Sequence, residues 1–237
     1  RPDIYEIGKR AKEMGFYVGL SSNGTLIDDD NIKKITEVGF NYVGVSIDGL
    51  RENNDEFRQM QGGFDAALNG IKLCREHGIK AGWRFTLTEK NSADLPALLD
   101  IMDEHGVEKF YLSHLNYSGR GKRNSKGDAY FKTTRDAMDL LFDRAWNDVV
   151  AGKATEYVTG NNDADGVYLL HWAAKRFPER VELLRQHLDR WGGNSSGVNI
   201  SNIDNLGNVH PDTFWWSHHL GNVKDRPFSD IWKNTDD

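Results

Sequence analysis

Along the first 116 residues, apolar and polar positions repeat one pattern four times. An amphipathic helix ends at a glycine, a short apolar strand follows, and polar, turn-forming residues come after the strand. The helices end at Gly15, Gly39, Gly78 and Gly106. Strands that alternate with helices pair in parallel, so the pattern predicts an α/β fold. Because ligands bind at the carboxyl ends of parallel strands, it also predicts where a site lies.

The same pattern sets the expected boundaries of each element. We expect helices over about 2–14, 28–38, 64–77 and 91–105, and strands over 16–20, 42–47, 79–87 and 110–115. Residues 117–128 are rich in glycine and positive charge, which is typical of a loop. A long helix over 133–150, an extended piece over 156–159 and helices over about 167–176 and 179–190 complete this part.

From Gly192 onward the chain is rich in glycine and asparagine. Alternating apolar residues on both sides of 204–208 predict two strands joined by a tight turn, that is, a small β-hairpin. We therefore expect three parts: a sheet with helices over 1–128, a helical continuation over 129–190 and a small C-terminal extension over 191–237.

Composition narrows the function classes. The chain has 237 residues and a formal net charge of −6, which argues against a nucleic-acid partner because such partners require a basic surface. No apolar run approaches the roughly 20 residues of a membrane helix, and no signal peptide is visible, so we expect a cytoplasmic protein without a membrane partner. Cys74 is the single cysteine and is expected in the core, on the apolar face of its helix.

Polar side chains gather where the first two strands are expected to end. Ser22, Asn23 and Thr25 follow the first strand, and Ser46 and Asp48 follow the second. Hydroxyl, amide and carboxylate groups at one edge of a sheet suit a small polar ligand. Asn-Gly and Asp-Gly are also common turn formers, so each motif alone has a purely structural explanation.

Three further candidates come later in the sequence. Arg58 comes twelve residues after Ser46 and could bind a carboxylate through two parallel hydrogen bonds, or else lie solvated at the surface. His114 and Asn116 follow the fourth strand.

Two further clusters, one basic and one aromatic, could each bind a ligand or have a purely structural role. The first is basic and could receive the carboxylates of an anionic ligand or form a solvated loop: Arg120, Lys122, Arg123 and Lys126. The second could contact a planar ligand or consist of scattered surface and core residues: His210, Trp215, Trp216, His218 and His219.

Several of these motifs, read in order, resemble a known family. They are Ser21-Ser22-Asn23-Gly24-Thr25, Val45-Ser46-Ile47-Asp48-Gly49, Phe57-Arg58, Gly62-Gly63-Phe64-Asp65 and Ser118-Gly119-Arg120-Gly121. Together they resemble the radical S-adenosylmethionine (SAM) enzymes of the SPASM type. The segments 191–197 and 202–216 are similar, more narrowly, to the NirJ proteins of haem d1 biosynthesis. The resemblance implies a partial (β/α)6 barrel of the TIM type with a SPASM-like extension, into which the predicted hairpin fits.

The resemblance also implies a chemistry. A reduced 4Fe-4S cluster would cleave SAM to a 5′-deoxyadenosyl radical, which acts on the propionate side chains of a tetrapyrrole, an iron isobacteriochlorin, with propionate loss and installation of oxo groups on didecarboxysirohaem. Flavodoxin or ferredoxin would supply electrons. Ser22 and Asn23 would border SAM, Ser46 would bind its ribose or carboxylate, and Arg58 would bind its carboxylate. His114 and Asn116 would face the adenosine or the substrate.

The chain departs from the family pattern in its iron ligands. The three-cysteine cluster motif and the Gly-Gly-Glu motif belong upstream of Arg1, and further cysteines are expected beyond Asp237, so both termini are expected to be cuts. Asp212 and Trp191 stand where many relatives have cysteine. We therefore expect this chain alone to be inactive.

Three other functions remain open from the sequence. One is a peptide maturase of the same fold, since SPASM relatives modify peptides. Another is a cofactor-free isomerase or aldolase that uses Asp48, Glu89 and His114 as acids and bases. The third is a non-catalytic tetrapyrrole-binding module built on the tryptophan- and histidine-rich segment.

Overall fold

The computed structural model describes residues 2–233, which form two compact units. The first unit runs through Leu115 and resumes over 126–165. The second takes 116–125 and the described residues from Gly166 onward. The predicted division at 128 and 190 remains a prediction.

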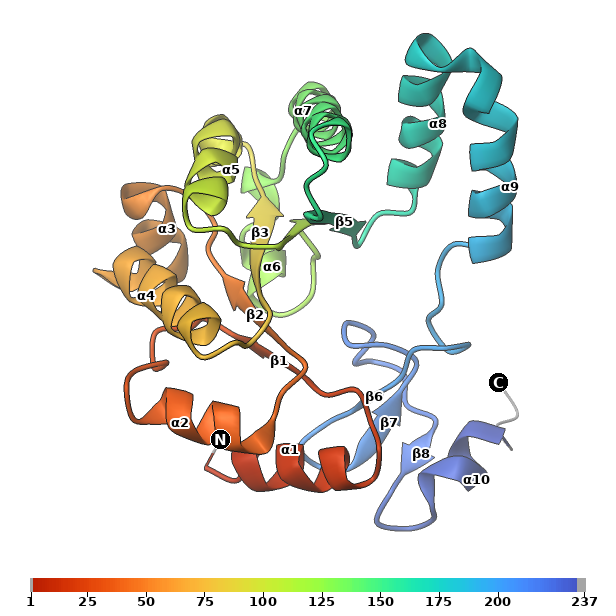
Figure 1. Ribbon diagram of the computed structural model, residues 1–237. Coiled ribbons are helices and arrows are strands. Elements are labelled where there is room, and N and C mark those ends of the chain that lie inside the picture. Colours follow the sequence, from red (N-terminus) through yellow and green to blue (C-terminus); the bar gives the residue numbers. More distant parts are fainter. Residues whose placement is uncertain (1, 234–237) are drawn as a thin grey trace. The chain divides into compact units, whose positions relative to one another are not determined.

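The first unit contains a five-stranded parallel sheet whose strands follow the chain order (Figure 1). The strands are β1 (Gly19–Ser22), β2 (Tyr42–Ser46), β3 (Ala81–Leu87), β4 (Lys109–His114) and β5 (Glu156–Gly160). The helices between them are α1 (Ile4–Glu13), α2 (Asn31–Val38), α3 (Arg51–Arg58), α4 (Gly63–Glu76), α5 (Leu95–Glu104) and α7 (Phe131–Val150). The sheet is open between β1 and β5, which confirms the predicted partial barrel.

The core of this unit lies between one face of the sheet and the helices. Val45, Trp83, Phe85 and Phe110 lie on that face and are almost completely buried. Helix α4 packs on β2 and β3, and α7 packs on β5. Cys74 of α4 is fully buried, as predicted, and burial raises the pKa of its thiol to about 11.

Three sequence-based expectations need correction, and a fourth is confirmed and extended. The strand expected over 16–20 is β1, displaced to Gly19–Ser22, because pairing with β2 begins at Gly19 while Phe16 and Tyr17 stay exposed. The expected loop over 117–128 contains helix α6 (Arg120–Arg123) and a 3-10 turn (Ser125–Gly127). Helix α3 was not anticipated. The extended piece over 156–159 is β5, which pairs with β4 as a fifth parallel strand.

The second unit ends in a small three-stranded antiparallel sheet. Its elements after α8 (Ala164–Arg176) are α9 (Val181–Trp191), β6 (Asn202–Ile203), β7 (Asn208–His210), β8 (Gly221–Asn222) and α10 (Phe228–Lys233). The Asp204 carboxylate accepts the backbone N–H groups of Leu206 (2.8 Å) and Asn208 (2.9 Å), which holds the turn between β6 and β7. The predicted hairpin is therefore present, with β8 as a third strand.

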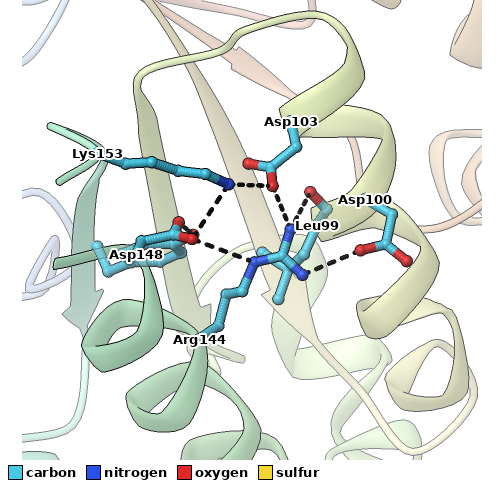
Figure 2. A network of polar contacts seen from close by, with 7 residues as sticks. Leu99, Asp100, Asp103, Arg144, Asp148 and Lys153 are labelled. Atoms are coloured by element: carbon cyan, nitrogen blue, oxygen red, sulfur yellow. Dashed lines mark hydrogen bonds and ion pairs between the residues drawn. The ribbon is translucent and has the colours of Figure 1, made fainter. Parts of the chain in front are cut away.

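A network of charged side chains joins α5, α7 and β5 (Figure 2). Arg144 of α7 donates to Asp100 at 2.9 Å and to Asp103 at 2.5 Å, and Lys153 donates to Asp103 at 2.7 Å. Tyr157 donates to the buried Asp148 at 2.6 Å. These residues lie toward the amino ends of β4 and β5, away from the edge where parallel sheets bind ligands.

None of the helices in residues 2–233 is long and apolar enough to cross a membrane.

Candidate functional site

The face of the sheet opposite the buried core carries polar side chains. Residues paired in parallel strands point to the same side, and every second residue of a strand shares that side. Ser46 pairs with Arg84, Arg84 with Tyr111, and Thr86 with Ser113. Ser21 pairs with Gly44, which shares the side of Ser46. One face of the sheet therefore carries hydroxyl groups and the Arg84 guanidinium near the carboxyl ends of β1–β4.

Arg84 is a charged group of this face. Lys109 and Glu156 lie on the same face, but they pair with each other at the first residues of β4 and β5. The Arg84 guanidinium lies over the Tyr111 ring, 4.5 Å from the ring centroid, and the arginine side chain is partly buried. No carboxylate pairs with it among the described residues. A Cβ atom at Gly44 would lie 3.0 Å from the Arg84 side chain, so glycine provides the space that the arginine occupies. An unpaired, half-buried guanidinium held on an aromatic ring is suited to bind an anion.

The serines at the strand ends differ in their bonding. The Ser46 hydroxyl has no hydrogen-bond partner in the part of the chain that the structure describes. Ser22 points to the other side, because it pairs with the buried Val45, and its hydroxyl accepts the Gly24 N–H at 3.1 Å. Ser46 is therefore available to a ligand.

Asn23 takes part in a turn. Its side-chain oxygen accepts the Thr25 N–H (3.3 Å) and hydroxyl (3.2 Å). These are the contacts expected of turn chemistry. Whether Ser22 and Asn23 also contact a ligand stays a prediction.

Arg58 makes an ion pair with the fully buried carboxylate of Asp48. The same carboxylate accepts the Thr86 N–H at 2.6 Å, and the Asp48 N–H donates to the Asn54 side chain at 2.9 Å. Asn91 donates to the carbonyl oxygens of Asp48 and Thr86, both at 2.8 Å. Asp48 thus joins the end of β2 to the end of β3, beneath Ser46.

This pairing limits what Arg58 can do. Burial raises the pKa of the Asp48 carboxyl above its ordinary value, and the Arg58 guanidinium offsets the rise only in part. Because the guanidinium neutralises a buried carboxylate, only its remaining N–H groups can reach a ligand. The proposed contact between Arg58 and a SAM carboxylate stays a prediction.

His114 ends β4 and contacts the buried Asp165 at the start of α8. Its Nε2 lies 2.9 Å from each carboxylate oxygen. His114 pairs with the buried Leu87 and therefore belongs to the helix-covered face. Asn116 lies in the second unit, where its side chain accepts the Ser118 N–H at 3.1 Å. The predicted contacts of His114 and Asn116 with the adenosine or the substrate stay predictions.

Sequence reasoning missed Ser21 and Arg84. A signal for Arg84 exists in β3, where Arg84 and Thr86 alternate with the buried Trp83, Phe85 and Leu87. That alternation places a charge on the face opposite the core. Choosing between Ser21 and Ser22 requires the register of β1 against β2, which the sequence alone does not supply.

Among residues 2–233, no three His, Cys, Asp or Glu side chains are grouped so that they could hold a metal ion. The Arg84 guanidinium and the Ser46 hydroxyl, on neighbouring strands, fit an anionic, hydrogen-bonding ligand.

The sequence of the chain is similar to those of known proteins. Residues 1–89 match the family described as the Radical SAM superfamily. Over 100% of its length the chain is 49% identical to the pre-heme d1 synthase of Dinoroseobacter shibae. It is 43% identical, again over 100% of its length, to the Fe-coproporphyrin III synthase of Methanosarcina barkeri. The chain spans 59% of the length of each relative.

Solved structures share the fold. Streptococcus suis SuiB bound to S-adenosylmethionine superposes with a TM-score of 0.72 over 98% of this chain and 51% of SuiB, at 14% identity. Native anSMEcpe with bound AdoMet gives a TM-score of 0.64 over 92% of this chain and 56% of that protein, at 18% identity.

Proposed function

We propose that this chain, whose residues 1–89 match the Radical SAM superfamily, is part of a SAM-dependent enzyme that modifies a tetrapyrrole in the way of haem d1 biosynthesis. The reaction is loss of propionate carbons and installation of oxo groups on an iron isobacteriochlorin. When bound, SAM and a reduced 4Fe-4S cluster would supply a 5′-deoxyadenosyl radical, with flavodoxin or ferredoxin as the electron donor. The cluster ligands belong to the whole protein, outside residues 2–233.

One observation carries this proposal: the similarity to pre-heme d1 synthase extends over 100% of the chain at 49% identity. The similarity to the PqqA peptide cyclase of Gluconobacter oxydans is 25% and covers 70% of the chain. This contrast favours a tetrapyrrole over a peptide as the substrate.

The residues of the sheet edge fit the methionine moiety of SAM. Its carboxylate would pair with the Arg84 guanidinium, which has no carboxylate partner among the described residues, and the Ser46 hydroxyl would bind the carboxylate or ribose. Ser46 pairs with Arg84 in the sheet, so both groups act on one ligand from neighbouring strands. Arg58, through Asp48, holds the backbone beneath Ser46 in place.

A cofactor-free acid-base mechanism finds no support in the contacts of its candidate residues. Asp48 is paired with Arg58, and His114 contacts Asp165. Glu89 accepts the Tyr130 N–H and the Thr133 hydroxyl, each at 3.0 Å. The three groups thus belong to separate structural networks.

The test uses the whole protein, reconstituted with iron and sulfide and reduced with dithionite. With SAM it should release 5′-deoxyadenosine, and with an iron isobacteriochlorin it should release the propionate carbons, both measured by mass spectrometry. Arg84→Met should raise the Kd for SAM by about tenfold or more, because a charge-assisted bidentate contact is lost.

Arg75→Met is the matched control, since this arginine lies on the outer helix α4. It should leave the Kd for SAM within about twofold. Substrate turnover by a colourless, cluster-free protein, or the absence of 5′-deoxyadenosine with reduced cluster and SAM, contradicts the proposed function. Equal SAM affinity in wild type and Arg84→Met contradicts the assignment of Arg84.

A further inference from the structure

Three consecutive aromatic residues of the second unit are exposed. Phe214, Trp215 and Trp216 have 42%, 52% and 53% of their surface open to solvent. We call these three residues the aromatic platform. Large aromatic side chains gain most from burial, so three of them exposed in succession point to a binding surface.

Hydrogen bonds hold the platform in one conformation. The Asp212 carboxylate accepts the N–H groups of Phe214 (2.6 Å) and Trp215 (2.9 Å) through one oxygen, and the Ser196 hydroxyl (2.6 Å) through the other. The Trp216 indole N–H donates to the Thr213 carbonyl at 2.7 Å. The backbone of the platform and the Trp216 ring are therefore pre-ordered, which lowers the entropic cost of binding a flat ligand.

The two tryptophan rings also lie beside histidine rings of the same unit, with tilted ring planes. Trp215 lies 5.1 Å from the His218 ring, and Trp216 lies 5.5 Å from the buried His210, centroid to centroid. Each tryptophan thus has a supporting ring beside it while half of its surface stays open. Such an arrangement is suited to stacking on a planar π-system.

A positive segment is attached to the platform. The Ser118 hydroxyl donates to the Phe214 carbonyl at 3.2 Å, and Lys122 and Arg123 follow four and five residues later, both exposed. At about 3.5 Å per residue, the Lys122 Cα lies within about 14 Å of the Ser118 Cα. Cations within that reach of an aromatic surface complement a ligand that is flat and carries carboxylates at its rim.

We propose that the aromatic platform stacks on the face of the tetrapyrrole macrocycle while Lys122 and Arg123 bind its carboxylates. The proposal rests on the proposed function and adds to it the residues that select the substrate. A neutral planar ligand would leave the two cations without a role, and a small anion would leave the three rings exposed. An anionic macrocycle uses both features.

The test titrates this chain with Fe-coproporphyrin III and with metal-free coproporphyrin III, followed by tryptophan fluorescence and the porphyrin absorption band. Both probes should bind, because stacking and carboxylate contacts do not need the iron. Trp215→Leu should raise both Kd values by about 5- to 100-fold, since it keeps an apolar side chain but removes the ring.

Trp191→Leu is the matched control, because Trp191 lies in the same unit with 55% of its surface exposed. It should leave both Kd values within about twofold. The Lys122→Gln, Arg123→Gln double variant should weaken binding and reduce its salt dependence. The Arg185→Gln, Arg190→Gln double variant on α9 should do neither.

Wild-type affinity in Trp215→Leu, an equal loss in Trp191→Leu, or binding of the iron probe alone overturns the proposal. Circular dichroism of each variant separates lost binding from lost folding. Failure of SAM cleavage in the wild type counts against the proposed function, whereas failure of porphyrin binding alone counts against the platform.

Discussion

At the scale of single residues, the partner of Arg58 defines its role. The guanidinium is three-quarters buried, with 25% of the side chain exposed, and faces a carboxylate with no exposure at all. Removing one partner of such a pair leaves an uncompensated buried charge, which costs about 3 kcal/mol. We therefore expect Arg58→Gln to lower the free energy of unfolding of the first unit by that amount even without any ligand, as measured from the transition of that unit in urea.

A double-mutant cycle separates this structural role from a direct contact with SAM. In the double variant Asp48→Asn, Arg58→Gln, the loss in free energy of unfolding should be smaller than the sum of the losses in the two single variants. We expect this difference, the coupling energy, to be about 1–3 kcal/mol. Strictly additive losses in stability, or an Arg58→Gln protein as stable as wild type but with weaker SAM binding, would show that Arg58 acts on the ligand instead.

The residues that were predictable are those whose neighbours in the sequence determine their environment. Cys74 is predictable as a core residue because the apolar positions of its own helix show which face is buried. Ser46 was assigned to the strand end from the adjacent apolar run. The Asp48–Arg58 pair was not predicted, since it requires helix α3 to bring Arg58 back over the strand, and Arg84 requires the register with β2.

At the scale of elements, Arg144 of α7 and Lys153, which lies between α7 and β5, fasten this part of the chain to α5 through Asp103 (Figure 2). Burial alone would raise the pKa of the Asp103 carboxyl, but hydrogen bonds from Lys153 and Arg144 bring it below its ordinary value. A lowered folded-state pKa contributes stability that is present above the unfolded-state pKa. This contribution disappears as the pH falls below about 4.

Asp103→Asn should therefore lower the free energy of unfolding by about 1–2 kcal/mol at pH 7, since the Asp103 side chain is mostly buried. Its deficit relative to wild type should shrink as unfolding is repeated from pH 5 down to pH 2.5. Asp100→Asn is the matched control: it also faces Arg144, but 66% of its side chain is exposed, so its loss should change stability little. A deficit for Asp103→Asn that is independent of pH contradicts this account.

The elements themselves were predictable where apolar periodicity is strong. Strands β2, β3 and β4 lie within the expected ranges to one or two residues, because each is a run of residues buried on the helix-covered face. The sequence does not predict helix α3, because its eight residues include a single apolar side chain, Phe57, and therefore show no apolar periodicity. Its position comes from contacts that the sequence does not display, such as Asp55, which accepts the Gly62 and Phe64 N–H groups at 2.5 and 2.9 Å.

At the scale of the whole molecule, the two units differ sharply in their apolar cores. Of the 32 buried apolar side chains among the described residues, four belong to the second unit: Trp172, Ala173, Val209 and Ile231. Burial of apolar area is the main favourable contribution to folding, so local stability should follow this distribution. A single cooperative transition for the entire chain is not expected from such a division.

Hydrogen–deuterium exchange of the chain measures this difference directly. Amides of β2, β3 and β4 should exchange at least about tenfold more slowly than those of β6, β7 and β8. An amide in a sheet exchanges when its unit unfolds locally, and this is rarer where the apolar core is larger. Val209→Ala removes one of the four side chains and should accelerate exchange over 202–222 while the rates in β2–β4 stay unchanged. Met102→Ala, a truncation in the core of the first unit, is the converse control. If either substitution accelerates exchange uniformly along the whole chain, the two units unfold together, and the difference in their cores does not govern local stability.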